Sequence, residues 1–258
     1  MRSRFIWFHH FHKVAGSSVV SLALANGEKF AEHSHNGNPH REDGRPVRTW
    51  EMSDRGFRTY LRGLKEDGVT FAASEWGLPL AALEDENSFS FTILRDPISR
   101  IVSNYTFDVQ GGYTSWRNVN SWQAFEGGNW ARDNYYVRTL VGRDWHEDME
   151  ETEALDMALR RLGNFDAVLI LEDGQLERRV RELFGWEVSA SVEKKARVGL
   201  LGRCLRAARA LQQGRLDLAA IRLGSMSRIS ARELRVLAEI NSLDVKLFEV
   251  AKRRYGSP

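Results

Sequence analysis

Short, almost wholly apolar runs alternate with amphipathic segments along this chain. The apolar runs are typical of strands buried on both faces of a parallel sheet, and they predict strands over 5–11, 69–74, 89–94 and 165–171. The amphipathic segments predict helices over 16–25, 96–107 and 174–184, and one long helical period over 231–255. This alternation favours an α/β fold of three layers, in which helices flank a central, mostly parallel sheet that binds ligands at the carboxyl ends of its strands.

Two segments do not fit this alternation. Residues 31–58 are polar with few apolar positions, and we expect a long surface loop there. Residues 108–135 are rich in Gly, Asn and Trp, and we expect irregular structure. No linker or internal repeat marks a second domain, so the sequence predicts a single domain over 1–258.

Composition narrows the class of protein and of partner. A net charge of +2 excludes a polyelectrolyte, so anion binding must come from local clusters, and no nucleic-acid partner is expected. No apolar run approaches the roughly 20 residues that a membrane span needs, and the apolar run at the N-terminus ends too early for a signal peptide. The single cysteine, Cys204, excludes an internal disulfide, and together these features predict a cytoplasmic protein. The oligomeric state cannot be predicted.

The first predicted strand is followed by "HKVAGSS" (12–18), which opens a helix. The N-terminus of a helix binds anions through its free N–H groups and partial positive charge. The small residues Ala15 and Gly16 let the backbone approach a phosphate, and Lys13 adds a full positive charge. The lysine precedes the glycine, so this is not the Walker A order of P-loop kinases.

A second strand–helix junction, "LRDPISRIVSNY" (94–105), also carries groups that bind phosphate. Asp96 and Pro97 are favoured at the start of a helix, so the helix begins directly after the strand. Arg95, at the strand end, and Ser103, within the helix, supply an arginine fork and a hydroxyl for a phosphate dianion.

Together the two junctions resemble the nucleotide site of sulfotransferases that use 3′-phosphoadenosine 5′-phosphosulfate (PAPS). The family's first loop, usually P-K-[TA]-x-[GS]-[ST]-[ST], resembles "HKVAGSS", and its second motif, R-[DE]-P-x-x-R-x-x-S-x-Y, is fully matched by "RDPISRIVSNY". His12 stands where the family usually has proline, which either loosens the loop or lets His12 contact the cofactor. The likeness is greatest to the Golgi-type and bacterial carbohydrate sulfotransferases and covers nearly the whole chain, with 199–224 as a candidate insertion.

The resemblance implies a P-loop-like sulfotransferase fold and a metal-independent transfer of the sulfuryl group from PAPS to a hydroxyl of a small-molecule or glycan acceptor, leaving the bisphosphate product PAP. Lys13 would neutralise the leaving phosphate. Glu75, which follows the strand before "FSFTILRDP", would be the general base, with a nearby histidine as the alternative, and we expect burial to raise the pKa of Glu75. The cofactor-binding residues implied are His12, Lys13, Val14, Ala15, Gly16, Ser17, Ser18, Arg95 and Ser103.

Several alternatives stay open at this point. The chain could be a nucleotide-dependent small-molecule kinase, or a non-catalytic nucleotide-binding protein on the same fold. The crowded histidines suggest a metal site, but neighbouring side chains on a strand point to opposite faces, so His9 and His10 cannot share one ion, and no metal is predicted. His33, His35 and His40 are expected to be solvated. The aromatic residues of 113–130 are expected either to stack on the acceptor or to pack in the core; they are Tyr113, Trp116, Trp122, Phe125 and Trp130.

Overall fold

The computed structural model describes residues 5–111, 113–125, 131–187 and 229–257. These residues form two compact units. The first unit holds the described residues of 1–96, 136–192 and 246–258, and the second holds those of 97–135 and 193–245. The predicted single domain stays a prediction. The possible insertion at 199–224, Cys204 and Trp130 lie outside the described residues.

The first unit contains a four-stranded sheet in the order β4-β1-β5-β6, and every neighbouring pair is parallel. The strands are β1 (Phe5–His9), β4 (Phe71–Ser74), β5 (Ser88–Leu94) and β6 (Ala167–Ile170). Each is a predicted strand whose ends differ from the predicted ones by at most two residues. The central parallel sheet flanked by helices confirms the predicted α/β class.

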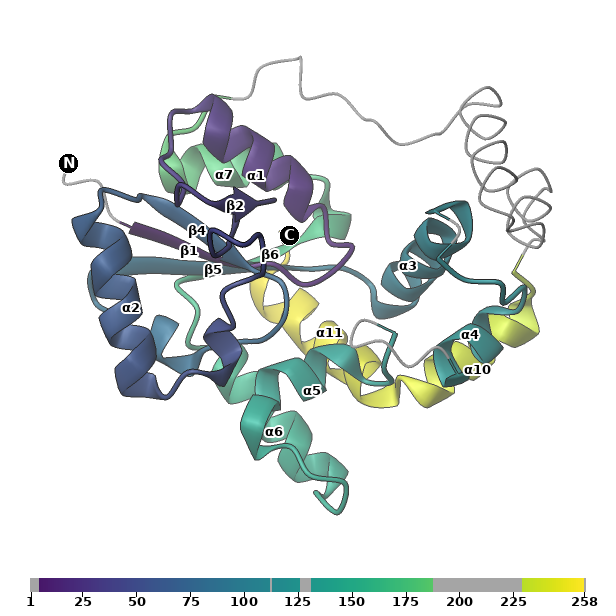
Figure 1. The fold of residues 1–258 in the computed structure, drawn as a ribbon. Helices are drawn as coiled ribbons and strands as arrows, with labels where there is room; N and C mark the ends of the chain where they lie inside the picture. Colours follow the sequence, from purple (N-terminus) through teal and green to yellow (C-terminus); the bar gives the residue numbers. More distant parts are fainter. Residues whose placement is uncertain (1–4, 112, 126–130, 188–228, 258) are drawn as a thin grey trace, which may run out of the picture. The chain divides into compact units, whose positions relative to one another are not determined.

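Helices cover both faces of this sheet. Because successive side chains of β1 point to opposite faces, residues of this one strand pack on both sides. On one face, Trp7 meets Phe57 of α2 (Asp54–Glu66) edge-on at 5.1 Å between ring centroids. On the other, Phe8 stacks on Phe91 at 4.6 Å, and Phe184, at the end of α7 (Leu176–Phe184), packs against Phe91. Figure 1 shows α1 (Gly16–Ala25) beside α7 over the sheet.

The prediction of a long surface loop over 31–58 was only partly right, because short elements interrupt the irregular backbone. The segment contains a hairpin of β2 (Ser34–His35) and β3 (Asn38–Pro39), a short 3₁₀ turn η1 (Thr49–Glu51), and the start of α2. Ser53 caps α2 by accepting a hydrogen bond from the backbone N–H of Gly56 at 3.2 Å. The helix buries Phe57, Leu61 and Leu64, which recur at the spacing of one helix face.

The other helices near the sheet were only partly predicted. The helix over 174–184 is confirmed as α7, whereas the short helices that link β5 to β6 were not anticipated. The first unit also has the 3₁₀ turns η2 (Leu80–Ala82), η3 (Gly142–Asp144) and η4 (Leu171–Asp173). The remaining helices of this part of the chain are α5 (Tyr135–Val141), α6 (Glu151–Leu162) and α11 (Ser242–Tyr255). None of the described helices combines the length and the apolar character needed to cross a membrane.

Three details of the described residues in 97–255 differ from the expectations. The stretch expected to be irregular contains α4 (Val119–Phe125), and α3 (Pro97–Gly111) extends past its predicted end. The long C-terminal period is divided into α10 (Ala231–Ile240) and α11 at Asn241. The buried amide of Asn241 exchanges hydrogen bonds of 3.0 and 3.1 Å with the amide of Gln123, so a side-chain pair occupies the position where the helix breaks.

Candidate functional site

The sheet order places three of the predicted site residues at one edge. Lys13 follows β1, Glu75 follows β4 and Arg95 follows β5, and β1 lies between β4 and β5. All three strands are parallel, so their carboxyl ends meet at the edge where open α/β sheets bind ligands. The topology thus brings together a lysine, a carboxylate and an arginine from distant parts of the sequence.

The loop between β1 and α1 is held in an unusual backbone conformation. Lys13 has φ 67° and Ala15 has φ 68°, both in the left-handed region that non-glycine residues rarely adopt. Such a conformation costs about 1–3 kcal/mol per residue and is concentrated at ligand sites, where successive amides form anion-binding concavities. Ser17 and Ser18 are exposed in the first turn of α1. The loop therefore has both the strain and the helix terminus of an anion cradle.

The absence of a side chain at Gly16 is required by packing, as well as by the approach of a phosphate. It is buried at the start of α1, and a Cβ built on it would lie 1.9 Å from two ring atoms of His10. Real Cβ atoms do not approach so closely, so the buried His10 ring requires a glycine here. The helix N-terminus and the His10 side chain are consequently packed against one another.

Arg95 connects the two predicted phosphate elements. Its guanidinium Nη1 donates a hydrogen bond of 3.2 Å to the backbone carbonyl of Lys13. The hydroxyl of Tyr136 donates to the carbonyl of Arg95 at 3.0 Å, and Glu172 accepts a hydrogen bond of 2.9 Å from the backbone N–H of Asp96. Sequence reasoning gave no role to Tyr136 or Glu172, although Glu172 stands directly after a predicted strand.

Ser103, the other predicted 3′-phosphate ligand, is half-buried on α3 and belongs to the second unit. On the same helix, the guanidinium of Arg100 is buried and lies 4.3 Å from the centroid of the Tyr135 ring. Arg100 therefore contributes to the packing of this unit.

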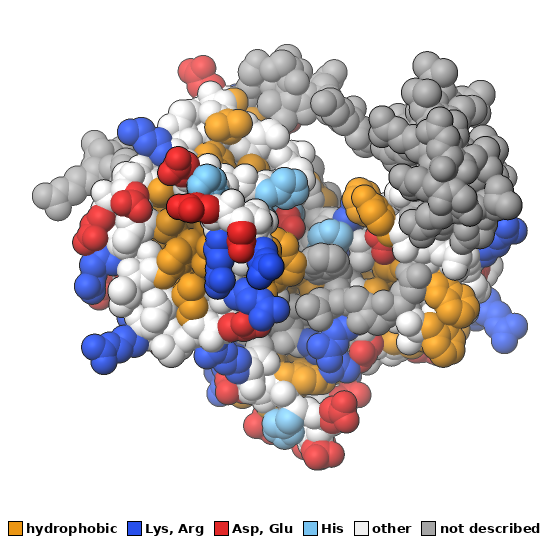
Figure 2. Space-filling view, viewed as in Figure 1, with side chains coloured by type: hydrophobic (Ala, Val, Ile, Leu, Met, Phe, Trp, Pro, Cys, Tyr) orange, Lys and Arg blue, Asp and Glu red, His pale blue; other side chains and the backbone are white. Residues whose placement is uncertain are grey.

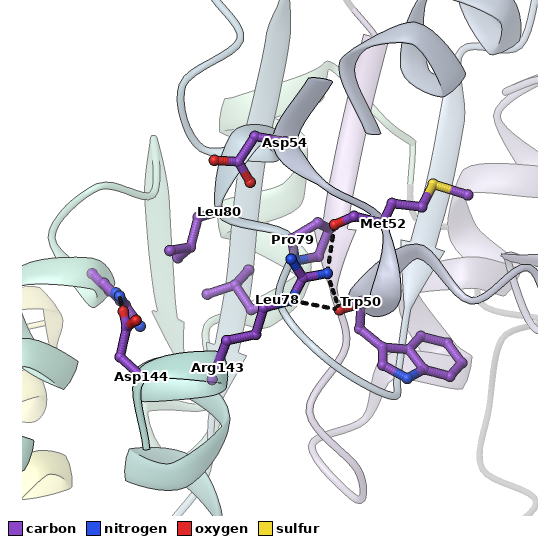
Figure 3. A pocket seen from close by; sticks show the side chains of 10 residues that line it. Trp50, Met52, Asp54, Leu78, Pro79, Leu80, Arg143 and Asp144 are labelled. Atoms are coloured by element: carbon purple, nitrogen blue, oxygen red, sulfur yellow. Dashed lines mark hydrogen bonds and ion pairs between the residues drawn. The ribbon is translucent and has the colours of Figure 1, made fainter. Parts of the chain in front are cut away.

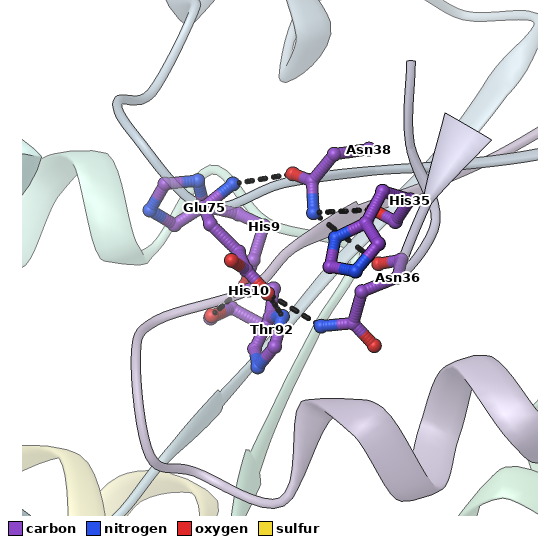
Figure 4. A network of polar contacts seen from close by, with 7 residues as sticks. All are labelled: His9, His10, His35, Asn36, Asn38, Glu75 and Thr92. Atoms are coloured by element: carbon purple, nitrogen blue, oxygen red, sulfur yellow. Dashed lines mark hydrogen bonds and ion pairs between the residues drawn. The ribbon is translucent and has the colours of Figure 1, made fainter. Parts of the chain in front are cut away.

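Glu75 is held by donors from two other segments of the chain (Figure 4). Its Oε1 accepts a hydrogen bond of 2.6 Å from Asn36 Nδ2 and lies 2.6 Å from His10 Nδ1. Its backbone N–H donates to Asn38 Oδ1 at 2.9 Å. The carboxylate side chain is only 14% exposed, so these contacts replace most of its hydration.

The expectation that the pKa of Glu75 is raised was wrong. Burial alone does raise this pKa, but the hydrogen bond and charge of His10, the hydrogen bond of Asn36 and the charge of His12 together outweigh it. The pKa of Glu75 is therefore below its ordinary value. The carboxylate is ionised at neutral pH, as a group that accepts a proton must be.

The remaining histidines divide into buried and exposed groups. His9 is fully buried on the opposite face of β1 from His10, with its ring edge-on to Phe11 at 4.6 Å between centroids. His33 and His35 are exposed as expected, whereas His40 is half-buried, with its Nδ1 2.8 Å from the carbonyl of Asn38. In the described part of the chain, no group of three or more His, Cys, Asp or Glu side chains is arranged to hold a metal ion.

Replacing His9 with phenylalanine should make the protein less sensitive to acid. Burial, and secondarily the charge of His10, lowers the pKa of His9 from 6.5 to about 3. Between pH 6.5 and about pH 3, His9 binds a proton in the unfolded chain but not in the folded protein. The folded state is therefore not destabilised by His9 above pH 6.5, and it loses stability as the pH falls toward 3. At about pH 5 the loss due to His9 is about 2 kcal/mol.

Urea unfolding at about pH 8 and about pH 5 measures this effect. Between the two pH values, His9→Phe should lose about 2 kcal/mol less stability than the wild type. The matched variant His33→Phe changes an exposed histidine and should lose as much as the wild type. Equal losses in His9→Phe and the wild type would show that His9 is not the acid-sensitive group.

A cavity of about 310 Å³ lies in the first unit, between η1, the segment after β4, and η3 (Figure 3). Arg143 reaches across it and donates to the carbonyls of Trp50 (2.8 Å from Nη2) and Met52 (2.5 Å). The Trp50 ring in turn contacts the ring of Trp76, the residue after Glu75, at 5.6 Å between centroids. Arg143 is therefore linked, through Trp50, to the residue that follows Glu75.

The described aromatic residues among those considered for the acceptor lie in the second unit, and they differ in exposure. Trp122 is buried against Tyr105, and its Nε1 donates to Asp108, so it belongs to the core. Trp116 stacks on Phe125 at 5.4 Å, and Phe125 is 72% exposed.

Figure 2 shows acidic and basic side chains interspersed on one face, with a small group of basic side chains near its middle.

The sequence matches the model of the Sulfotransferase family over residues 2–251, nearly its whole length. No curated protein matches the chain significantly. The match covers both candidate phosphate elements and the segment that carries Glu75.

Proposed function

This chain belongs to the sulfotransferase family, and from that premise we propose that it transfers the sulfuryl group of PAPS to a hydroxyl of a small-molecule or glycan acceptor. The observation that carries the proposal is the contact between its two phosphate elements. Arg95 donates to the carbonyl of Lys13, at the carboxyl ends of adjacent parallel strands. PAPS carries phosphate groups at the 5′ and 3′ positions of its ribose, so its binding site needs two phosphate-binding elements close together at one sheet edge.

Each element has a distinct task in this proposal. Lys13 and the amides at the start of α1 bind the 5′-phosphosulfate, aided by the hydroxyls of Ser17 and Ser18. Arg95 binds the 3′-phosphate, the group that distinguishes PAPS from ATP. Ser103 is assigned to the same phosphate on the basis of the sequence motif alone. The remaining loop residues, His12, Val14, Ala15 and Gly16, contribute backbone amides or line the nucleotide.

Sulfuryl transfer resembles phosphoryl transfer in that most of the catalysis is positioning and charge stabilisation. The bond from sulfur to the bridging phosphate oxygen breaks, and its electron pair stays on the phosphate of PAP. A new bond forms between sulfur and the acceptor oxygen, whose proton passes to the carboxylate of Glu75. Lys13 stabilises the negative charge that accumulates on the leaving phosphate. The products are PAP, a sulfate ester and a proton, which Glu75 then releases to water.

Incubation with sulfur-labelled PAPS and separate panels of alcohols, phenols and neutral oligosaccharides tests the proposal. The expected result is one equivalent of PAP formed for each equivalent of labelled ester. Phosphorylation of the same acceptors by ATP–Mg²⁺, with PAPS left intact, would instead establish a kinase. Tight binding of PAP with no transfer to any panel or to water would indicate a non-catalytic nucleotide-binding protein.

A further inference from the structure

The hairpin formed by β2 and β3 is hydrogen-bonded to β4, the strand that Glu75 follows. Its turn is Asn36-Gly37, and both residues are left-handed, with φ 50° and 78°. Two such residues form the hairpin turn that Asn-Gly favours most. The carbonyl of Gly37 accepts a hydrogen bond of 2.8 Å from the backbone N–H of Ala73 in β4. A Cβ on Gly37 would come within 3.1 Å of Ala73, so the turn lies directly against the edge of the sheet.

The same turn reaches the carboxylate. Asn36 Nδ2 donates to Glu75 Oε1 at 2.6 Å, and His10 Nδ1 lies 2.6 Å from the same oxygen (Figure 4). Both contacts are made to Oε1. Among the described residues, no hydrogen bond to Oε2 is found. One oxygen of the carboxylate is thus fixed by the protein, and the other is left for a group from outside.

We propose that Asn36 is a positioning residue, which together with His10 holds Glu75 Oε1 so that Oε2 takes the proton of the acceptor. This inference rests on the proposed function and adds the hairpin 34–39 to the catalytic machinery. Asparagine suits both tasks, since it tolerates the left-handed turn and also carries a donor amide. Glycine would satisfy only the turn. Aspartate would satisfy the turn but present a negative charge to Glu75.

A second consequence concerns the charge of Glu75. The ionisable groups that act on this carboxylate are His10 and His12, both from the end of β1 and the loop after it. Asn36 adds a hydrogen bond that favours the ionised form and so lowers the pKa of Glu75. Its removal must therefore raise the pH at which Glu75 titrates, whereas a residue that only shapes the hairpin would leave that pH unchanged.

The test compares Asn36→Gly and Asn36→Asp with the wild type. The carboxyl ¹³C resonance of Glu75, assigned by its loss in Glu75→Gln, is followed against pH. The midpoint should move to higher pH in Asn36→Gly and further in Asn36→Asp. For transfer from PAPS, to water or to an acceptor found in the panels, kcat should fall about 10-fold or more in Asn36→Gly with an unchanged KM for PAPS.

The matched control is Asn26→Gly. Asn26 lies at the C-terminal end of α1, where its side-chain amide donates hydrogen bonds to the carbonyls of Leu22 and Glu187. It should leave both the midpoint and kcat unchanged. A Glu75 midpoint that Asn36→Gly does not move, or a wild-type kcat in that variant, overturns the positioning role. A wild-type chain that binds no PAP and sulfates nothing overturns the proposed function instead, and the titration tells the two failures apart.

Discussion

Lys13→Ala is expected to lower kcat for sulfuryl transfer by about 10²–10³-fold, the usual cost of removing one group that stabilises developing charge. The lysine stands in a strained loop at the end of a central strand, where its carbonyl is tied to Arg95. No charge develops on the leaving phosphate until the sulfur–oxygen bond breaks. The loss should therefore be larger in kcat than in the dissociation constant of PAPS, in which that charge has not yet developed.

Steady-state kinetics and a thermal unfolding curve check this together. Lys29→Ala is the matched control, because Lys29 is exposed and its hydrogen bonds with Thr70 and Phe71 are made by its backbone. It should transfer at the wild-type rate. Lys13→Arg keeps the positive charge and should recover part of the loss. If Lys13→Ala were folded and kept wild-type kcat, the leaving-group role would be refuted.

Glu75→Gln is expected to lower kcat by about 10²–10⁴-fold, the range for losing a general base. The glutamine carbonyl can still accept the hydrogen bond of Asn36, so the fold around the site should survive. Binding of PAP should stay within twofold of the wild type, about the scatter of such measurements, because Glu75 is not assigned to the nucleotide. Isothermal titration with PAP and single-turnover transfer separate the two effects.

The pH dependence of the wild type provides a second check on Glu75. Its pKa is below the ordinary value, chiefly because the contacts with His10 and Asn36 overcome the opposing effect of burial. A lowered pKa keeps the base ionised as the pH falls. The pKa that the acid limb of the kcat/KM profile reports for Glu75 should therefore lie below the normal glutamate range. Glu66→Gln, at the exposed end of α2, should leave the profile unchanged. An acid limb above the normal glutamate range would contradict the network in Figure 4.

The elements that hold the site could be predicted because their signals are local. A strand such as β5, buried over most of its length, appears as a nearly continuous apolar run. The start of α3 is marked by Asp96 and Pro97. Lys13 and Arg95 were found from motifs of a few residues directly after such strands. The parallel order of the strands then brings the two motifs to one edge.

What could not be predicted depends on partners distant in sequence. Asn36 and Glu75 are separated by 39 positions, and the Asn-Gly turn was hidden in a segment with few apolar residues. Burial of Glu75 was expected, but the direction of its pKa shift is decided by donors that only the fold supplies. The helix break at Asn241 likewise follows from Gln123, 118 positions away. The helix α2 was missed although Ser53 and the spacing of its apolar residues were visible in the sequence.

Thermal unfolding with PAP, compared with ATP–Mg²⁺, tests the central claim most directly. A ligand at 100 times its dissociation constant adds about 2.7 kcal/mol, which raises the Tm of a protein of this size by several degrees. We predict this rise with PAP, a smaller one for Arg95→Ala at the same PAP concentration, and none with ATP–Mg²⁺. A rise with ATP–Mg²⁺ alone, or with neither nucleotide, would contradict the assignment of the two phosphate elements to PAPS.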